Sequence, residues 1–366
     1  MATIKDGKGT FALATFDKQA KLAKHEFGRP DPGSDDVAID IHFCGMCHSD
    51  LHACNGDWGI DSFPIAPGHE IAGVVTAIGK NISQYKVGQR VAVGCFVDSC
   101  KKAECEQCSI GLEQHCSQVI QTYSSKYPKF GGHPEAEGYH TNGGYSTAIT
   151  VNQRFVFAIP EKMKMEVAGP LLCSGITMYS PLNRHVKGKK NQKVGIVGFG
   201  GLGHIGVKIA KAMGAEVVVF SRSTDKEEEA KALGAKLLVH SNREALNAAS
   251  RSFDVILDTV SAKHDVMSLI STLKPTGAYV LIGAIAAPVS VDIMALLFNR
   301  YKVEGSLVGG VPETAEMLEF CSVNNIEPTY DVIHAKDADE HFRKLEEGKV
   351  GARRAVIDIS TIRELQ

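Results

Sequence analysis

Four cysteines stand close together in one short segment of the chain. They are Cys100, Cys105, Cys108 and Cys116, all within seventeen residues. Four thiolates at such spacing are the ligands of a closed tetrahedral zinc site, which leaves no position for water or substrate. Such a site stabilises a loop that has no core of its own. The spacing therefore predicts a structural zinc.

A glycine-rich segment offers a second recognisable chemistry. Gly198, Gly200 and Gly203 have GxGxxG spacing, directly after an apolar strand pattern and at the start of a helical one. Glycines in this arrangement permit a tight turn and a close backbone approach, while the helix N-terminus presents amides to a pyrophosphate. The strand before and the helix after are the context that the motif requires. The segment therefore predicts a dinucleotide site.

The end of the next strand indicates which dinucleotide is bound. An acidic residue there holds the ribose hydroxyls of NAD, whereas a cation with small hydroxyls suits the 2′-phosphate of NADP. This chain has Ser221, Arg222, Ser223 and Thr224, with Lys226 close by. We therefore expect NADP(H). The alternative is that the two cations only begin a solvated helix.

Two different patterns of predicted strands must position these motifs. Short β-branched runs at 37–43, 71–79 and 90–96, separated by Gly, Pro and Asp clusters, are typical of an all-β unit. From about residue 166, six short apolar strands alternate with helical segments, which predicts an α/β fold with a doubly wound parallel sheet. We place these strands at 194–199, 217–220, 236–240, 254–258, 278–283 and 302–309.

The tail after residue 311 is too short to bury a core by itself. It contains two amphipathic helical patterns and the strand-like RRAVIDI. We expect it to dock on the N-terminal unit, which gives a first domain of 1–165 completed by 311–366 and a second domain of 166–310. The segment 124–144, with its Gly, Pro and His residues, is predicted to be a long loop.

Composition and charge narrow the classes of function. Lys plus Arg is 40 and Asp plus Glu is 42, so the net charge is −2, and hydrophobic residues make up 44%. This balance gives no reason to bind nucleic acid and is typical of a globular chain with a sizeable core. MATIKDGKGTF lacks the apolar stretch of a secretory leader, and no run is long enough to span a bilayer. We therefore expect a cytoplasmic protein without a membrane partner.

Several segments together resemble a known family. They are CGMCHSDLH (44–52), FPIAPGHEIAGVV (63–75), the four-cysteine lobe, PLLCSGITMYSPL (170–182) and VGFGGLGHIGVKIAKAMGA (197–215). The set resembles the cinnamyl alcohol dehydrogenase branch of the zinc-dependent medium-chain dehydrogenases and reductases. The likeness extends to GSLVGG (305–310) and the terminal RRAVIDI. It implies an N-terminal GroES-like β domain, a Rossmann domain, an active site in the cleft, and a homodimer.

The resemblance implies a second metal site. Cys47, His69 and Cys173 correspond to the ligands of a catalytic zinc, a Cys₂His set whose fourth position stays open. Glu70 is a nearby carboxylate that can approach the metal in some states. Asp50 is the acceptor that fixes the His69 imidazole tautomer.

Ser49 and His52 occupy the family's proton-relay positions. The plain alternatives are that Ser49 caps a helix beginning at Asp50 and that His52 is a solvent-facing helix residue. The implied cofactor contacts are Gly198, Gly200, Gly201, Leu202, Gly203, Ser221, Arg222, Ser223, Lys226 and Thr177.

Trp58 and Gln121 are the candidate substrate contacts. Gln121 stands where monolignol-forming plant members often place a Trp against the aromatic substrate. The lobe also has four residues between Cys100 and Cys105 where the family usually has two, and the loop 124–144 is longer than in plant members. These departures argue against a lignin-specific role.

The implied activity is hydride transfer between NADP(H) and primary alcohols or aldehydes, aromatic or medium-chain aliphatic, with zinc as Lewis acid and aldehyde reduction favoured. One alternative is a reductase of imine or enal substrates on the same scaffold, which the presence of Ser49 and Glu70 disfavours. The other is a noncatalytic zinc-binding interaction module, which the mixed charges of KKAECEQC disfavour. A zinc-free quinone reductase would lack both metal-ligand sets.

Overall fold

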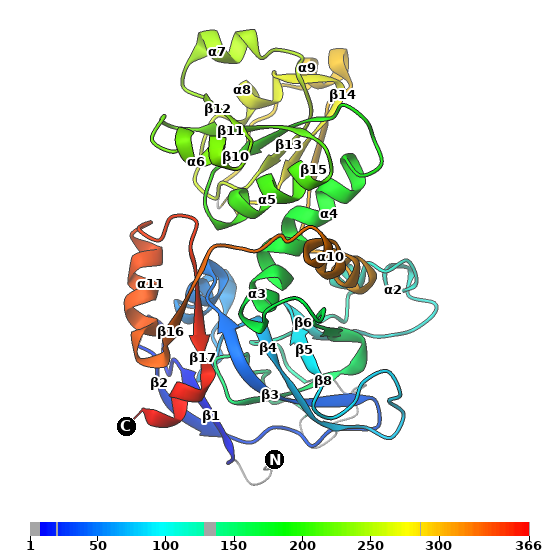
Figure 1. The fold of residues 1–366 in the computed structure, drawn as a ribbon, viewed down its shortest axis with the longest axis vertical. Helices are drawn as coiled ribbons and strands as arrows, with labels where there is room; N and C mark the ends of the chain where they lie inside the picture. The colour runs from blue at the N-terminus through cyan, green and yellow to red at the C-terminus, as the bar shows by residue number, and fades with distance from the viewer. Residues whose placement is uncertain (1–7, 20, 128–136, 286, 366) are drawn as a thin grey trace. The chain divides into compact units, whose positions relative to one another are not determined.

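Two sheets of different character organise the chain (Figure 1). The computed structural model describes residues 8–19, 21–127, 137–285 and 287–365, so part of the predicted loop 124–144 lies outside the described residues. Contacts divide the chain into unit 1, formed by Met1–Cys173, Gly310–Ser322 and Glu327–Gln366, and unit 2, formed by Ser174–Gly309 and Val323–Ile326. Each unit has its own hydrophobic core.

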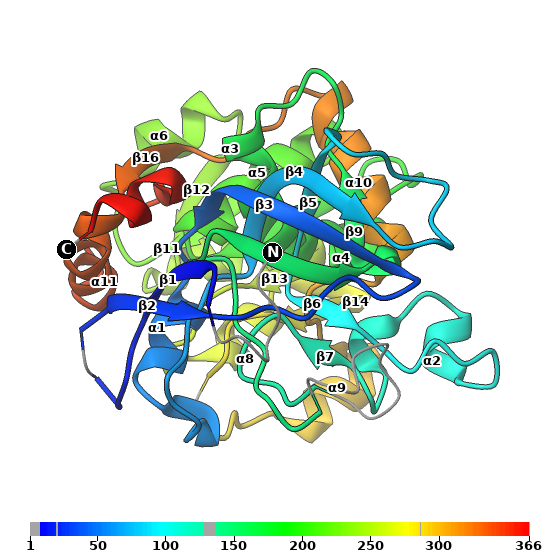
Figure 2. The same ribbon diagram turned by 90° about the horizontal axis from the view of Figure 1, so that it is seen from below.

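The large sheet of unit 1 has seven strands in the order β16-β17-β3-β4-β5-β9, with β8 paired to β3. Its pairs are antiparallel except for β16 with β17. Figure 2 shows β3, β4 and β5 side by side. The strand bounds are β3 Asp36–Gly45, β4 Glu70–Ile78, β5 Arg90–Val93, β8 Ala148–Asn152, β9 Val156–Ala158, β16 Tyr330–His334 and β17 Arg354–Asp358. Two small pairs, β1 (Thr10–Ala14) with β2 (Ala23–Phe27) and β6 (Phe96–Asp98) with β7 (Ile120–Gln121), complete the unit.

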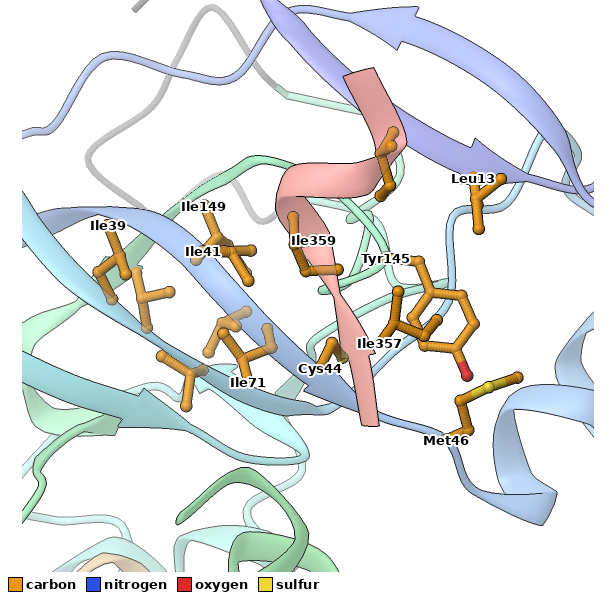
Figure 3. Close-up of a cluster of buried hydrophobic side chains, with 14 of the residues drawn as sticks. Leu13, Ile39, Ile41, Cys44, Met46, Ile71, Tyr145, Ile149, Ile357 and Ile359 are labelled. Carbon is orange, nitrogen blue, oxygen red and sulfur yellow. The ribbon is translucent and has the colours of Figure 1, made fainter. Parts of the chain in front are cut away.

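The end of the chain completes this sheet. Strand β17 runs antiparallel to β3, with Val356 opposite Gly45 and Ile357 opposite Cys44. Figure 3 shows Ile357 and Ile359 among buried side chains of the N-terminal strands. Burial of these apolar side chains is what stabilises the tail on unit 1, because hydrophobic free energy scales with the apolar area removed from water. Its helices are α10 (Val311–Val323) and α11 (Ala338–Glu346).

Unit 2 is a six-stranded parallel sheet in the order β12-β11-β10-β13-β14-β15, which confirms the predicted doubly wound fold. The strands are β10 Lys193–Val197, β11 Glu216–Ser221, β12 Lys236–Val239, β13 Phe253–Asp258, β14 Leu273–Leu281 and β15 Lys302–Gly305. The last strand is shorter than the predicted 302–309. The helices are α4 Ile176–His185, α5 Gly201–Ala212, α6 Glu227–Ala232, α7 Arg243–Ala248, α8 Val266–Ile270 and α9 Ile293–Asn299.

The first segment of unit 1 ends at Cys173, eight residues beyond the domain boundary predicted at 165/166. Helix α3 (Met165–Pro170) packs on strands β3 and β4. The approach is close: a Cβ added at Gly169 would lie 2.2 Å from the Glu70 carbonyl oxygen. The segment therefore belongs by its contacts to the sheet of unit 1. Within the described residues, no helix combines the length and apolar character needed to cross a membrane.

Candidate functional site

Cys47 lies where strand β3 gives way to helix α1 (His48–Cys54), and it is the N-cap of that helix. The Asp50 carboxylate accepts a hydrogen bond from the Cys47 backbone N–H at 2.9 Å, which satisfies one of the amides left free at a helix start. This hydrogen bond fixes the backbone of Cys47 at the start of the helix. It also removes the capping explanation for Ser49, which lies inside the first turn.

Asp50 connects helix α1 to His69. The Asp50 side chain is fully buried, and its Oδ1 atom lies 3.1 Å from His69 Nδ1. The Gly68 N–H and the Tyr145 hydroxyl donate to the same carboxylate at 3.0 and 3.2 Å. A carboxylate at Nδ1 holds the proton there and leaves the lone pair on Nε2. The imidazole is therefore oriented to act as a metal ligand through Nε2.

The dispersed candidate ligands meet in one cluster. The ligand atoms of Cys47, His69, Glu70 and Cys173 lie within 4.8 Å of one another. Cys173 Sγ lies 3.2 Å from His69 Nε2 and 3.8 Å from Cys47 Sγ. A tetrahedral zinc with bonds of about 2.3 Å to sulfur and about 2.0 Å to nitrogen separates its ligands by roughly 3.5–3.8 Å. The donor set and its spacing fit zinc with one position open.

Glu70 places a carboxylate inside this cluster. It is fully buried, and neither carboxylate oxygen has a hydrogen bond to any described residue, although Oε1 lies within ion-pair distance of Arg354 Nη2 at 3.4 Å. Burial raises the pKa of Glu70 to about 8, against the opposing effect of the Arg354 charge. Burial alone would lower the pKa of Arg354, but the Glu70 charge raises it. A buried carboxylate without hydrogen bonds beside two thiols and an imidazole is what a cation in the cluster would stabilise.

Sequence reasoning missed three residues that surround the cluster: Tyr123, Tyr145 and Arg354. The Tyr123 hydroxyl lies 3.3 Å from His69 Nδ1, and the Tyr145 hydroxyl donates to Asp50. Arg354 also donates to the Met46 carbonyl at 2.8 Å. Each contact joins residues that are far apart in the chain, so no local sequence pattern predicts it. The only signal was indirect, because Arg354 belongs to the RRAVIDI segment.

The predicted relay residues occupy different surroundings. The Ser49 hydroxyl lies 3.7 Å from Cys47 Sγ, at the edge of the cluster. His52 is 42% exposed, and its Nδ1 atom lies 2.8 Å from Asp57 Oδ2. Among the described residues no hydrogen bond joins Ser49 to His52. Trp58 is 64% exposed, with its ring centroid 4.8 Å from that of His52, so it is not a core residue.

Gln121 lies on strand β7 with its side chain exposed. Its backbone N–H donates to the Ser125 hydroxyl at 3.1 Å and its carbonyl accepts from Thr141 at 3.0 Å. These bonds fix the backbone of the segment that leads to Tyr123. Within the described part of the chain no hydrogen bond connects the Gln121 side chain to the Cys47 cluster.

The four-cysteine lobe brings all its sulfurs together. Cys100, Cys105, Cys108 and Cys116 have their Sγ atoms within 4.8 Å of one another. Three of the pairs are 3.5, 3.7 and 3.9 Å apart, close to the roughly 3.8 Å expected between sulfurs of a tetrahedral zinc site. All ten cysteines are free, so these contacts are not disulfides. The two extra residues between Cys100 and Cys105 do not prevent the set from closing.

In unit 2, glycine stands at each of the three motif positions for a different structural reason. Gly198 has φ +88°, a conformation that residues with a Cβ rarely adopt. Gly200 is the N-cap of α5, whose first turn contains Gly201 and Leu202. A Cβ at Gly203 would lie 2.2 Å from the Gly198 carbonyl oxygen, so helix and turn could not approach as they do. The backbone amides at the start of α5 are suited to bind a phosphate.

The segment after β11 carries the predicted cofactor-selective residues. Arg222 and Ser223 are exposed, and no described residue forms an ion pair with Arg222. Lys226 Nζ donates to the Phe199 carbonyl at 2.8 Å, which places an ammonium beside the glycine turn. An acid is also present, because Asp225 accepts from the Ser223 hydroxyl at 2.8 Å. Thr177 is half-buried on α4.

The chain is similar to known proteins over nearly its whole length. Residues 33–161 match the family described as alcohol dehydrogenase GroES-like domain, and residues 201–323 match zinc-binding dehydrogenase. It is 43% identical to the NADP-dependent alcohol dehydrogenase C 1 of Mycolicibacterium smegmatis over 96% of this chain and 98% of that protein. The same identity and coverages hold for the aldehyde reductase YahK of Escherichia coli.

Solved structures agree with these matches. A cinnamyl alcohol dehydrogenase of Sorghum bicolor superposes with a TM-score of 0.88 and 36% identity, over 96% of this chain and 98% of that one. Two family descriptions, relatives above 40% identity and this superposition all cover both units. The chain therefore belongs to the zinc-dependent medium-chain alcohol dehydrogenases, in the branch that includes the cinnamyl alcohol dehydrogenases.

Proposed function

We propose that this chain catalyses the NADP(H)-dependent interconversion of primary alcohols and aldehydes at a zinc ion held by Cys47, His69 and Cys173. The observation that carries the proposal is the dispersed cluster of two thiols, one oriented imidazole and one buried carboxylate, with ligand atoms within 4.8 Å. Two thiolates and one neutral imidazole, with a fourth position open, are the ligand composition of a catalytic zinc site. The family membership of the chain supports the same reading.

The zinc would supply Lewis-acid polarisation of the substrate oxygen, and the nicotinamide would supply or accept the hydride. The protein's own contribution is to hold and orient these groups. Asp50 fixes the His69 ring through the 3.1 Å contact at Nδ1. Arg354 balances the charge of Glu70 from 3.4 Å. The four-cysteine lobe would hold a second, structural zinc, since no ligand position there remains open.

Ser49 and His52 would move the proton that accompanies hydride transfer. The Ser49 hydroxyl, beside Cys47, is placed to exchange a proton with the substrate oxygen. His52 is exposed enough to exchange protons with solvent, and Asp57 at 2.8 Å orients its ring. Because no hydrogen bond joins Ser49 to His52 in the described residues, an intervening group such as the cofactor ribose must complete the path.

NADP(H) is the proposed dinucleotide. The amides of Gly201, Leu202 and Gly203 begin α5, where a pyrophosphate is stabilised. Arg222, which no described residue pairs, is available to a 2′-phosphate, with Ser221, Ser223 and Lys226 beside it. Thr177 is the proposed contact from α4. The name of the Mycolicibacterium smegmatis relative supports this cofactor.

Aldehyde reduction with aromatic or medium-chain aliphatic substrates is the proposed direction and range. The name of the Escherichia coli relative, an aldehyde reductase, supports the direction. Trp58, which is exposed and has its ring tilted against that of His52, offers an aromatic surface to an apolar substrate tail. Gln121 is the proposed polar contact, from a strand whose neighbour Tyr123 approaches His69.

A homodimer is the proposed assembly. Helix α9 exposes four large apolar side chains, Ile293, Met294, Leu297 and Phe298. Next to it in sequence, β15 is the edge strand of the parallel sheet. An apolar helix face and an open strand edge in one region favour association with a second copy. Light scattering should give a dimer for the wild type and a monomer for Phe298→Glu, whereas Val87→Glu, at another exposed apolar residue of unit 1, should remain dimeric.

The test of the activity is the initial rate of nicotinamide oxidation with cinnamaldehyde, benzaldehyde and hexanal, each with NADPH and NADH at equal concentration. The proposal predicts turnover of all three aldehydes and a large preference for NADPH. Arg222→Asp should abolish that preference because it places a carboxylate against the 2′-phosphate, whereas Arg243→Asp, at another exposed arginine of unit 2, should not. No nucleotide consumption with any aldehyde would contradict the proposal, and a preference for NADH would contradict the assignment of Arg222.

A further inference from the structure

A buried carboxylate lies at the C-terminal end of strand β13 and has no role in the function proposed above. Asp258 is fully buried. Its Oδ2 atom accepts a hydrogen bond from the Tyr279 hydroxyl at 2.8 Å, and its Oδ1 atom accepts one from the Val260 N–H at 3.1 Å. The Nε2 atom of His264 lies 3.0 Å from Oδ2. One group from the neighbouring strand β14 and two groups from the following loop therefore converge on one carboxylate.

The contacts of His264 define its protons. Its Nδ1 atom lies 2.9 Å from the Ala262 carbonyl oxygen, which can only accept, so Nδ1 carries a hydrogen. Its Nε2 atom faces a carboxylate oxygen, where a lone pair would be repelled. His264 Nε2 and Asp258 Oδ2 thus lie within ion-pair distance, although their geometry is not that of a hydrogen bond. Burial raises the pKa of Asp258, against the opposing effects of Val260, Tyr279 and His264.

This contact closes a short loop, residues 259–264, that packs on the glycine turn. The Thr259 N–H and hydroxyl both donate to the Val197 carbonyl, at 3.0 and 2.7 Å. A Cβ at Gly198 would lie 2.7 Å from the Thr259 hydroxyl and 3.0 Å from a Val260 methyl group. On its other side, a Cβ at Gly283 would lie 2.4 Å from the Val260 carbonyl. The loop is thus held between the first motif glycine and the end of β14.

We infer that Asp258 and His264 are positioning residues for the dinucleotide, because they hold the loop 259–264 against Gly198 and so keep the phosphate-binding turn in its binding conformation. The inference rests on the proposed function, since it requires NADPH to bind at that turn. Neither residue needs to touch the cofactor. Their effect is on the affinity of the free enzyme for NADPH rather than on the chemical step.

The same strand provides a matched control. Asp254 lies at the other end of β13, where its carboxylate pairs with Lys274 Nζ at 2.8 Å and accepts from the Lys193 N–H at 2.8 Å. Both aspartates thus pair with a cation or a potential cation and accept from a backbone amide. Only Asp258 is joined to the loop that packs on Gly198. A general loss of sheet stability should appear in both variants, whereas a positioning effect should appear only at Asp258 and His264.

The experiment measures NADPH binding by nucleotide fluorescence, together with melting temperature, kcat and both KM values, for the wild type, His264→Leu, His264→Gln, Asp258→Asn and Asp254→Asn. We expect His264→Leu to raise the Kd and KM for NADPH about tenfold, with kcat and the KM for aldehyde changed less than about twofold. His264→Gln keeps an amide donor at the position of Nε2 and should recover part of the loss. Asp254→Asn should leave the Kd unchanged.

Two results would overturn the inference. If His264→Leu lowers the melting temperature but binds NADPH with the wild-type Kd, the contact is merely structural. If Asp254→Asn weakens binding as much as His264→Leu, the effect belongs to the sheet as a whole. Should Asp258→Asn fail to fold, the two His264 variants still decide. A wild-type chain that binds no NADPH would instead refute the proposed function, and the inference with it.

Discussion

The two cysteine clusters of unit 1 gather their ligands in opposite ways. The lobe takes four thiols from seventeen consecutive residues, whereas the dispersed cluster joins Cys47 to Cys173 across 126 positions and adds an imidazole and a carboxylate. A set of four thiols satisfies a tetrahedral ion by itself. A set of two thiols and one imidazole leaves a position that substrate can occupy. The composition of the ligand set thus separates a structural site from a reactive one.

The surroundings of the clusters differ as much as the ligands. Around the dispersed cluster, Asp50 and Glu70 are fully buried carboxylates, and Arg354 reaches one of them from the last strand. Around the lobe, the Ser99 hydroxyl and the Gln118 N–H contact the sulfurs, and the buried Glu113 carboxylate pairs with Arg154 at 2.9 Å. Fixed buried charges are costly unless they orient a ligand or stabilise an ion. At the dispersed cluster the buried carboxylates act on the ligands directly, through Asp50 at His69 and Glu70 among the ligand atoms, whereas Glu113 pairs with Arg154 and accepts from the Val311 N–H. This difference is what we expect if only the dispersed cluster does chemistry.

Cys47→Ala tests the difference in role between the two clusters with the largest expected effect. We expect kcat/KM for cinnamaldehyde to fall by about a thousandfold or more, because Lewis-acid stabilisation is worth several kcal/mol. Elemental analysis should show one zinc per chain lost while the lobe keeps its own. Cys54→Ala, at a buried cysteine of the same helix outside the cluster, is the control and should retain both zinc ions. Substantial activity in Cys47→Ala would remove the dispersed cluster from the reaction.

A smaller effect is expected from Asp50→Asn, which keeps the shape of the side chain but not its charge. Because the carboxylate orients His69 through Nδ1, we expect zinc affinity or kcat to fall roughly 10–100-fold. Titration with a competing chelator measures the affinity directly. Tyr145→Phe removes one donor to Asp50 and should have a much weaker effect. An Asp50→Asn variant with wild-type affinity and kcat would show that the charge does not matter.

His52 tests the exposed end of the proposed proton relay. His52→Gln should lower kcat about tenfold without changing zinc content, since the proposed role is proton transfer and not metal binding. Partial rescue by imidazole in the buffer would distinguish a proton-transfer role from a packing role. The matched control is His42→Gln, at a histidine that also pairs with an aspartate but lies on β3. Equal losses in both variants would argue against the relay.

Cys105→Ala addresses the lobe and should have the smallest effect on turnover. We expect one zinc lost per chain and a free energy of unfolding lowered by a few kcal/mol, because metal binding there contributes to folding. The kcat of the remaining folded enzyme should change less than about threefold. Calorimetry and zinc analysis measure the two quantities. A loss of activity as large as that of Cys47→Ala, in enzyme that stays folded, would contradict the division of roles.

The comparison also explains what the sequence could predict. The lobe and the glycine turn are contiguous, so spacing alone indicated Cys100 to Cys116 and Gly198 to Gly203 as sites. The parallel sheet followed from the repetition of short apolar strands. Cys47, His69 and Cys173 could be joined only through the family resemblance, because nothing in local spacing connects them. The roles of all these residues remain predictions until they are tested.

Other features depend on the fold itself. Arg354 reaches Glu70 because β17 pairs with β3, a contact between strands more than 300 positions apart. Tyr123 reaches His69 from a loop whose path has no periodic pattern. The end of unit 1 at Cys173 depends on a close approach of Gly169 to Glu70 that no propensity predicts. Long-range pairing, not residue type, decides such contacts.

Stepwise removal of zinc from the wild-type enzyme separates a reactive cluster from a structural one within a single protein. Zinc content, aldehyde reductase activity and melting temperature are followed together during dialysis against a chelator. We expect two zinc per chain at the start, and loss of activity with little change in melting temperature as the content falls to one. Full activity at one zinc per chain, or a content well below two at the start, would contradict this expectation.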